Sequence, residues 1–125
     1  MIAKSVEDLK IDKDRKQYLS NLIYNIKSLE TVKYVVLFGS CARGDYNNNS
    51  DLDIAVITIY DDESMAIEDE IADKIYNLDG QGKDIETAID LLVIPNGIYE
   101  ATKNNKHTVT KQIEKEGVIL WTTIN

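Results

Sequence analysis

An apolar run that stops abruptly at a glycine is the clearest structural feature of this sequence. Residues 32–38 read VKYVVLF, and Gly39 follows directly. A run this short, rich in β-branched and aromatic residues, is typical of a buried strand rather than a helix. A glycine at that point lets the backbone come close to a ligand. The sequence therefore predicts a strand at residues 32–38 that ends in a close turn at Gly39 and Ser40.

A second strand is predicted at residues 51–58, and it carries paired acids. Residues two apart on a strand face the same side, so Asp51 and Asp53 present their carboxylates to one point. Two unpartnered carboxylates repel each other and are costly to bury, which favours a bound cation. Oxygen ligands in an open, hydrated site suit magnesium or manganese. The opposite face of this strand is apolar and is formed by Leu52, Ile54 and Val56.

The rest of the chain alternates between helical and strand patterns. Apolar residues at helical spacing predict three helices, at residues 14–30, 61–80 and 107–116. Short apolar runs predict two more strands, at residues 85–94 and 118–121. Either Asp12 or Asp14 is available as the N-cap of the first helix.

Composition bounds the location and the partners. At 125 residues the chain has the size of one domain, and we treat residues 1–125 as a single domain. Its 14 basic and 22 acidic residues give a formal net charge of -8, the wrong sign for attraction to duplex DNA or to an anionic membrane. The N-terminus carries acids where a signal peptide is apolar. These features predict a cytoplasmic protein with no membrane and no duplex DNA as partner.

A motif links the two strands. Ten residues separate the Gly39-Ser40 pair from Asp51. This pattern resembles the DNA polymerase β-like nucleotidyltransferase superfamily, and most of all the minimal nucleotidyltransferase (MNT) antitoxins that pair with HEPN-type ribonuclease toxins. The resemblance implies an α+β fold with a mixed β-sheet of about four strands flanked by helices. The matching positions are Gly39, Ser40, Ala42, Arg43, Gly44, Ser50, Asp51 and Asp53.

The resemblance also implies a role for each site residue. Asp51, Asp53 and Asp90 are the expected catalytic residues, and they are expected to hold two Mg²⁺ ions, with Mn²⁺ able to replace them. Asp90 is supported independently, because a lone acid in an apolar strand needs a partner, although a structural hydrogen bond would also supply one. Gly39 and Ser40 are expected to hold the triphosphate of ATP, the nucleotide substrate, by backbone N–H groups and the hydroxyl.

The roles of several other side chains, some in the motif and some near the C-terminus, are left open by the sequence. Arg43 is expected either to contact phosphate or the acceptor, or to form an ion pair with a nearby acid. Cys41 follows Ser40, but no histidine lies near it in sequence, so covalent catalysis is not expected. A group of four lysines is most simply a solvated face, although one of them could reach the triphosphate or an acceptor. These are Lys103, Lys106, Lys111 and Lys115.

The function that the resemblance implies is transfer of AMP from ATP to a hydroxyl, taken as that of a tyrosine, on a HEPN-type toxin within a hetero-oligomer. Two alternatives stay open. The first is a nucleotidyltransferase that acts on a small molecule such as an aminoglycoside, as a homodimer whose second subunit completes the pocket. The second is a non-catalytic binding module that masks its partner. Only the catalytic antitoxin should lose neutralisation when Asp53 is replaced by Asn.

Overall fold

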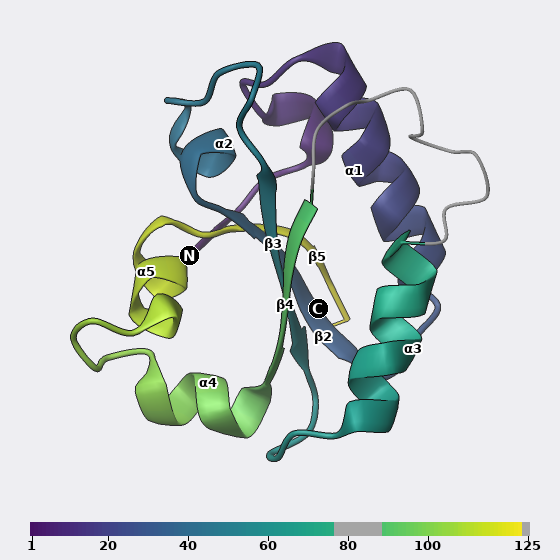
Figure 1. Ribbon diagram of the computed structural model, residues 1–125, viewed down its shortest axis with the longest axis vertical. Coiled ribbons are helices and arrows are strands. Elements are labelled where there is room, and N and C mark those ends of the chain that lie inside the picture. The colour runs from purple at the N-terminus through teal and green to yellow at the C-terminus, as the bar shows by residue number, and fades with distance from the viewer. Residues whose placement is uncertain (77–88, 124–125) are drawn as a thin grey trace.

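The structure is a computed structural model that describes residues 1–76 and 89–123 (Figure 1). In these ranges five strands form one mixed sheet in the order β1-β5-β2-β3-β4. Strand β2 runs antiparallel to both of its neighbours, whereas β3 and β4 are parallel, as are β1 and β5. The strands are β1 (Ile2–Ala3), β2 (Val32–Phe38), β3 (Leu52–Thr58), β4 (Ile89–Pro95) and β5 (Val118–Thr122).

Helices cover both faces of the sheet. Figure 1 shows α1 and α3 on one side and α4 and α5 on the other. Alternation along β3 explains why both faces are covered: Ile54 and Val56 pack into the α1/α3 core, and Ala55 and Ile57 into the α4/α5 core. The helices are the 3-10 turn η1 (Val6–Asp8), α1 (Lys13–Ile26), α2 (Ser40–Arg43), α3 (Met65–Tyr76), α4 (Asn96–Thr102) and α5 (Val109–Glu116).

The expected α+β fold with a mixed sheet is confirmed, with two corrections of detail. The sheet has a fifth strand in the described residues, because Ile2 and Ala3 pair with the start of β5. The first helix begins as predicted, with the Asp12 side chain capping it by accepting from Arg15 N, but it ends at Ile26 rather than near Glu30. Residues 77–88, which include the predicted ends of the second helix and the start of the third strand, lie outside the described residues.

The sequence did not predict α4. The third strand was predicted to end at residue 94, whereas Pro95 is both the last residue of β4 and the N-cap of α4. The helix has only seven residues and contains Gly97, so its intrinsic propensity is low. Burial of Tyr99, which is 2 % exposed, stabilises α4 by tertiary packing that the local sequence pattern does not predict.

Four strands have a terminus at the same end of the sheet, which we call the sheet edge: β2 ends there, and β3, β4 and β5 begin there. Because β2 is antiparallel to β3 and to β5, the last residues of β2 lie beside the first residues of both neighbours. Phe38 is opposite Asp53, and Leu37 is opposite Val118. Strand β4 starts at the same edge because it is parallel to β3. This edge therefore holds the turn at Gly39 and the predicted acids together.

Candidate active site

Gly39 makes the turn that leaves the sheet edge. It has φ 75° and ψ -157°, a conformation that glycine adopts without strain. The short helix α2 starts at the next residue, and the carbonyl oxygen of Gly39 accepts from the N–H groups of Ala42 and Arg43. The first N–H groups of a helix have no acceptor inside it, so the N–H groups at Ser40 and Cys41 are directed outward. The predicted turn is therefore present, with backbone donors where the triphosphate was expected.

The turn lies directly against Asp53. A Cβ atom placed on Gly39 would overlap the Asp53 carboxylate. This contact explains why the residue after β2 has no side chain, since any other residue would displace the acid. The spacing in the sequence thus corresponds to a packing contact between the turn and an acid on the neighbouring strand.

Three acids share the space in front of the turn. Asp53 and Asp90 are paired in register on the parallel strands β3 and β4, and Asp51 immediately precedes β3. Alternation along the two strands puts Asp53 and Asp90 on the α4/α5 face. Burial, followed by the negative charges of Asp90 and Asp51, raises the pKa of the Asp53 carboxyl above its ordinary value. The structure therefore brings together all three acids that were expected in the site.

The three carboxylates do not form a finished metal centre. In residues 1–76 and 89–123, no three His, Cys, Asp or Glu side chains are arranged to hold a metal ion. Like charges placed close together repel, and a divalent cation would offset that repulsion. The donor set fits a hard divalent cation in chemistry, since all three side chains are carboxylates and two of them, Asp51 and Asp90, are exposed to water.

Arg43 forms ion pairs at the end of the turn. Its Nε donates to Asp45 Oδ2 at 3.2 Å, and its Nη1 donates to both carboxylate oxygens of Glu116 at 3.1 Å. The ion-pair role left open for Arg43 is therefore present. Contact of Arg43 with phosphate stays a prediction.

Glu116 is a site residue that the sequence analysis missed. The last residue of α5, it accepts from the N–H of Gly39 at 3.0 Å and from Gln112 Nε2 at 2.8 Å, in addition to Arg43. Burial acts to raise the pKa of its carboxyl, but hydrogen bonds from Gln112, Arg43 and Gly39 outweigh it and lower the pKa. An acid in the last turn of a helix is unfavourable with the helix dipole. This unfavourable position of Glu116 is the sequence feature that could have marked it as a site residue.

Arg15 is the second residue that was missed. It is 4 % exposed, and its Nη2 donates to the carbonyl oxygens of Asn47, Asn48 and Ser50 at 3.4, 3.2 and 3.0 Å. Its Nη1 donates to Asp12 at 2.7 Å. One buried guanidinium thus holds the loop that leads into Asp51. No local pattern gives this away, because the contacts span more than 30 residues of sequence.

Cys41 is buried beneath the turn. Its side chain is 3 % exposed, and its Sγ donates to the carbonyl oxygen of Asp51 at 3.5 Å. Burial raises the pKa of the thiol. A buried, protonated thiol is a poor nucleophile, which agrees with the expectation that Cys41 takes no covalent part.

The fold is that of a nucleotidyltransferase. The family model "Polymerase beta, Nucleotidyltransferase" matches residues 20–123. The chain belongs to this family. No protein of curated function matches the sequence significantly.

Solved structures share the fold at low sequence identity. One is a toxin–antitoxin with AMP-PNP, with a TM-score of 0.54 and 21 % identity over 90 % of this chain and 76 % of the other. A candidate nucleotidyltransferase from Sulfolobus solfataricus has a TM-score of 0.51 and 21 % sequence identity over 91 % of both chains. A mutant of the toxin–antitoxin MntA-HpeT has a TM-score of 0.51 and 20 % sequence identity over 92 % of this chain and 76 % of the other. At this identity the likeness shows the fold alone.

The helices add one further finding. In the described part of the chain, none is long and apolar enough to cross a membrane.

Proposed function

We propose that this protein transfers AMP from ATP to a tyrosine hydroxyl of a partner protein, as the antitoxin of a HEPN/MNT pair. The observation that carries the proposal is the contact between the Gly39 turn and Asp53, with Asp90 in register beside it. Backbone donors and carboxylates at one sheet edge are what a metal-bound triphosphate requires. Membership of the nucleotidyltransferase family supports the same reading.

The three acids are the proposed ligands of Mg²⁺. Asp53 is partly buried beside two other carboxylates. Burial first, and then repulsion from Asp90 and Asp51, raises the pKa of its carboxyl, and a divalent cation would relieve that repulsion. Bound magnesium supplies charge neutralisation at the α-phosphate and at the leaving oxygen. Manganese satisfies the same oxygen donors.

The remaining steps belong to the side chains and backbone of this chain. The turn at Gly39 and Ser40 orients the β and γ phosphates through the outward N–H groups of Ser40 and Cys41 and through the Ser40 hydroxyl. The acceptor oxygen forms a bond to the α-phosphorus, the bond from that phosphorus to the bridging oxygen breaks, and pyrophosphate leaves. Asp90 is exposed at the edge and accepts the proton of the acceptor hydroxyl.

The acceptor is proposed to be a protein because the acids face outward. Asp51 and Asp90 are both exposed, so a docked surface can bring a hydroxyl to them directly. Two of the solved structures with this fold are toxin–antitoxin complexes, one of them with AMP-PNP. The net charge of -8 also suits a basic partner. ATP as nucleotide and a cytoplasmic location complete the proposal.

The test uses the protein encoded by the neighbouring gene as the acceptor. The two proteins are incubated with Mg²⁺ and ATP, and the mass of the partner is measured before and after. We expect a gain of one AMP group on a tyrosine with the unmutated chain and none with Asp53→Asn.

Two other outcomes would replace the proposal. Release of pyrophosphate with an aminoglycoside, while the partner is unmodified, would assign the site to a small-molecule acceptor. Neutralisation of a co-expressed toxin that is as strong with Asp53→Asn as without it would show that the chain acts by masking its partner.

A further inference from the structure

The sheet edge arranges four features of the site in a row. The neighbouring strands β4, β3, β2 and β5 bring to this edge Asp90, Asp53, Gly39 and Glu116, in that order. Gly39 follows the last residue of β2, and Glu116 lies two residues before β5. A linear ligand held by the carboxylates at one end and by Gly39 in its middle would therefore have its other end at Glu116.

Beyond Glu116 the row opens into a groove along α5. The groove has a volume of about 710 Å³, and its lining includes Arg43, Lys111, Gln112, Lys115 and Glu116. Lys111 and Lys115 are four residues apart on the helix, so both stand on one face. The groove thus presents three cationic side chains against one carboxylate, in a chain whose net charge is -8. That local reversal of charge favours an anionic occupant.

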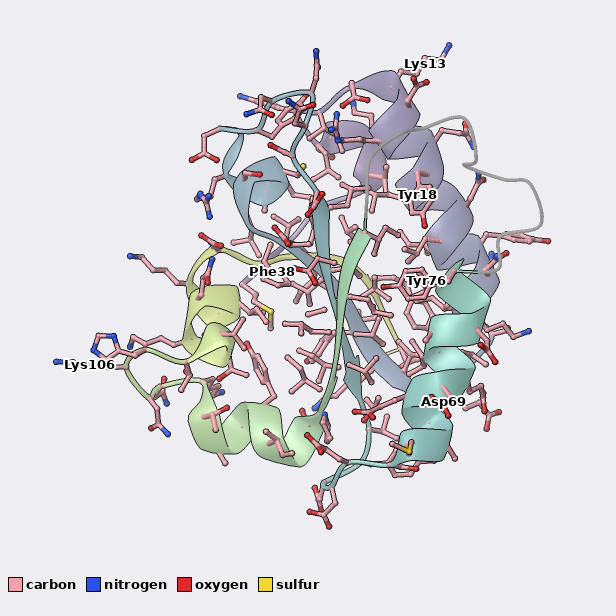
Figure 2. The ribbon with its side chains drawn as sticks, in the orientation of Figure 1. Lys13, Tyr18, Phe38, Asp69, Tyr76 and Lys106 are labelled. Atoms are coloured by element: carbon pink, nitrogen blue, oxygen red, sulfur yellow. The ribbon has the colours of Figure 1, made fainter. Side chains whose placement is uncertain are left out.

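The structure divides the four lysines that the sequence grouped together. Lys103 lies outside the groove and pairs with Glu100 at 2.9 Å. Lys106 also lies outside it, and Figure 2 shows its side chain pointing away from the molecule. Lys111 and Lys115 line the groove, and within the described residues neither has an acid at salt-bridge distance. Only this second pair is positioned to act on a ligand.

Glu116 shows that an oxyanion fits at the mouth of the groove. Its carboxylate accepts from the Gly39 N–H at 3.0 Å, from Gln112 Nε2 at 2.8 Å and from Arg43 Nη1 at 3.1 Å. A backbone N–H, an amide and a guanidinium are the donors that phosphate oxygens use in proteins. A phosphate oxygen arriving at this point would meet the same three donors once the Glu116 side chain moves aside.

We propose that this groove binds the terminal phosphates of the nucleotide and the pyrophosphate released from it, with Lys111 and Lys115 as phosphate-binding residues. The inference rests on the proposed function, because the row is oriented with the α-phosphorus at the carboxylates. When the bond from that phosphorus to the bridging oxygen breaks, the electron pair stays with the pyrophosphate. The two lysines and Arg43 neutralise that charge, and Glu116 gives up the Gly39 N–H to the incoming phosphate.

The test measures binding rather than turnover. Isothermal titration with Mg²⁺ compares pyrophosphate, AMP and AMP-PNP on the unmutated chain and on Lys111→Gln/Lys115→Gln. The variant is expected to bind pyrophosphate about tenfold more weakly and to bind AMP unchanged, since AMP has no terminal phosphates. Lys103→Gln/Lys106→Gln removes the same net charge outside the groove and is expected to bind both ligands like the unmutated chain.

Each contrary outcome has a separate meaning. Equal pyrophosphate affinity in the two double variants would overturn the groove assignment, while AMP-PNP binding that depends on Asp53 would leave the proposed function standing. If the unmutated chain bound neither pyrophosphate nor AMP-PNP, both proposals would fail. Weaker binding of the partner protein with unchanged pyrophosphate affinity would overturn the phosphate assignment in favour of an acidic segment of the partner.

Discussion

Gly39 packs against Asp53 so closely that a Cβ atom at position 39 would overlap the carboxylate. The φ of 75° at Gly39 adds strain for any L side chain. Gly39→Ala is therefore expected to lower the free energy of unfolding by about 1–3 kcal/mol and to abolish binding of Mg²⁺ with AMP-PNP. Urea denaturation and isothermal titration measure the two effects.

Gly44 offers a matched control for that change. It also has a positive φ, 89°, but a Cβ atom there would meet nothing within 4 Å. Gly44→Ala should show the backbone strain of about 1 kcal/mol without the clash, and nucleotide binding should persist. Equal nucleotide affinity in the two variants would contradict the role given to the Gly39–Asp53 contact.

Arg15 is predicted to determine the order of the loop before Asp51. Arg15→Leu removes the donors to the carbonyl oxygens of Asn47, Asn48 and Ser50, and it also removes the side-chain ion pair with Asp12. Loss of a buried charged donor should lower the free energy of unfolding by about 3 kcal/mol. Hydrogen exchange at residues 47–50 should become faster.

Lys13→Leu, on the same helix, is the control for Arg15→Leu. Lys13 is exposed at the start of α1, and Figure 2 shows its side chain pointing into solvent. Its replacement should change stability by no more than about 0.5 kcal/mol. Loop exchange that is equally slow in Arg15→Leu and in Lys13→Leu would show that Arg15 does not order the loop.

The ionisation of Asp53 should destabilise the metal-free protein. Burial and the charges of Asp90 and Asp51 raise the pKa of Asp53 above 3.8, so the folded chain holds this proton more tightly than the unfolded chain does. Stability from this group therefore falls as pH rises from 3.8 through the raised pKa. In EDTA at neutral pH, Asp53→Asn should be more stable than the unmutated chain, and this advantage should vanish at acidic pH.

Glu116 has a lowered pKa, the opposite of Asp53, but it does not affect the comparison between the unmutated chain and Asp53→Asn. Its lowered pKa gives a stabilisation that is present above 4.5 and is lost as pH falls through the folded pKa. Both the unmutated chain and Asp53→Asn carry Glu116, so its contribution largely cancels when their stabilities are compared.

Adding Mg²⁺ should raise the melting temperature of the unmutated chain and leave that of Asp53→Asn unchanged. A matching rise in the variant would argue against Asp53 as a metal ligand.

The Cys41 thiol should be unreactive in the folded protein. Its thiol is 3 % exposed, and burial raises its pKa, so a thiol reagent should react slowly with the native chain and rapidly in denaturant. Cys41→Ala should keep transferase activity, with a loss of stability of about 1 kcal/mol from the smaller side chain. Loss of activity in a folded Cys41→Ala protein would reopen a covalent role.

The sequence predicted the parts of the fold that local patterns determine. The apolar alternation of residues 52–57 and the run at 32–38 gave two strands at their observed places, because side-chain period and burial agree there. The motif indicated that Gly39 lies near the strand of Asp53, and the structure places Asp90, the predicted third acid, in register beside Asp53. These features depend on neighbours in sequence or on a known pattern.

The parts that could not be predicted depend on distant contacts. Arg15 reaches a loop more than 30 residues away, and Glu116 reaches Gly39 across 77 residues. Neither residue belongs to a motif, and each would be an ordinary exposed charge on an isolated helix. Helix α4 is likewise stabilised by the burial of Tyr99 rather than by its own sequence. Tertiary structure alone shows which charged residues reach the site and which aromatic side chain stabilises α4.

The most direct test of nucleotidyl transfer uses two labelled forms of ATP. Lysate of the source organism is incubated with the purified chain, Mg²⁺ and ATP labelled at either the α or the γ phosphorus, beside an Asp51→Asn/Asp53→Asn variant. We predict one protein band that is labelled by α-labelled ATP only when the unmutated chain is added, and no γ-labelled band that depends on adding the chain. A γ-labelled band that appears only with the unmutated chain, or an α-labelled band that the variant also produces, would contradict transfer of AMP at these carboxylates.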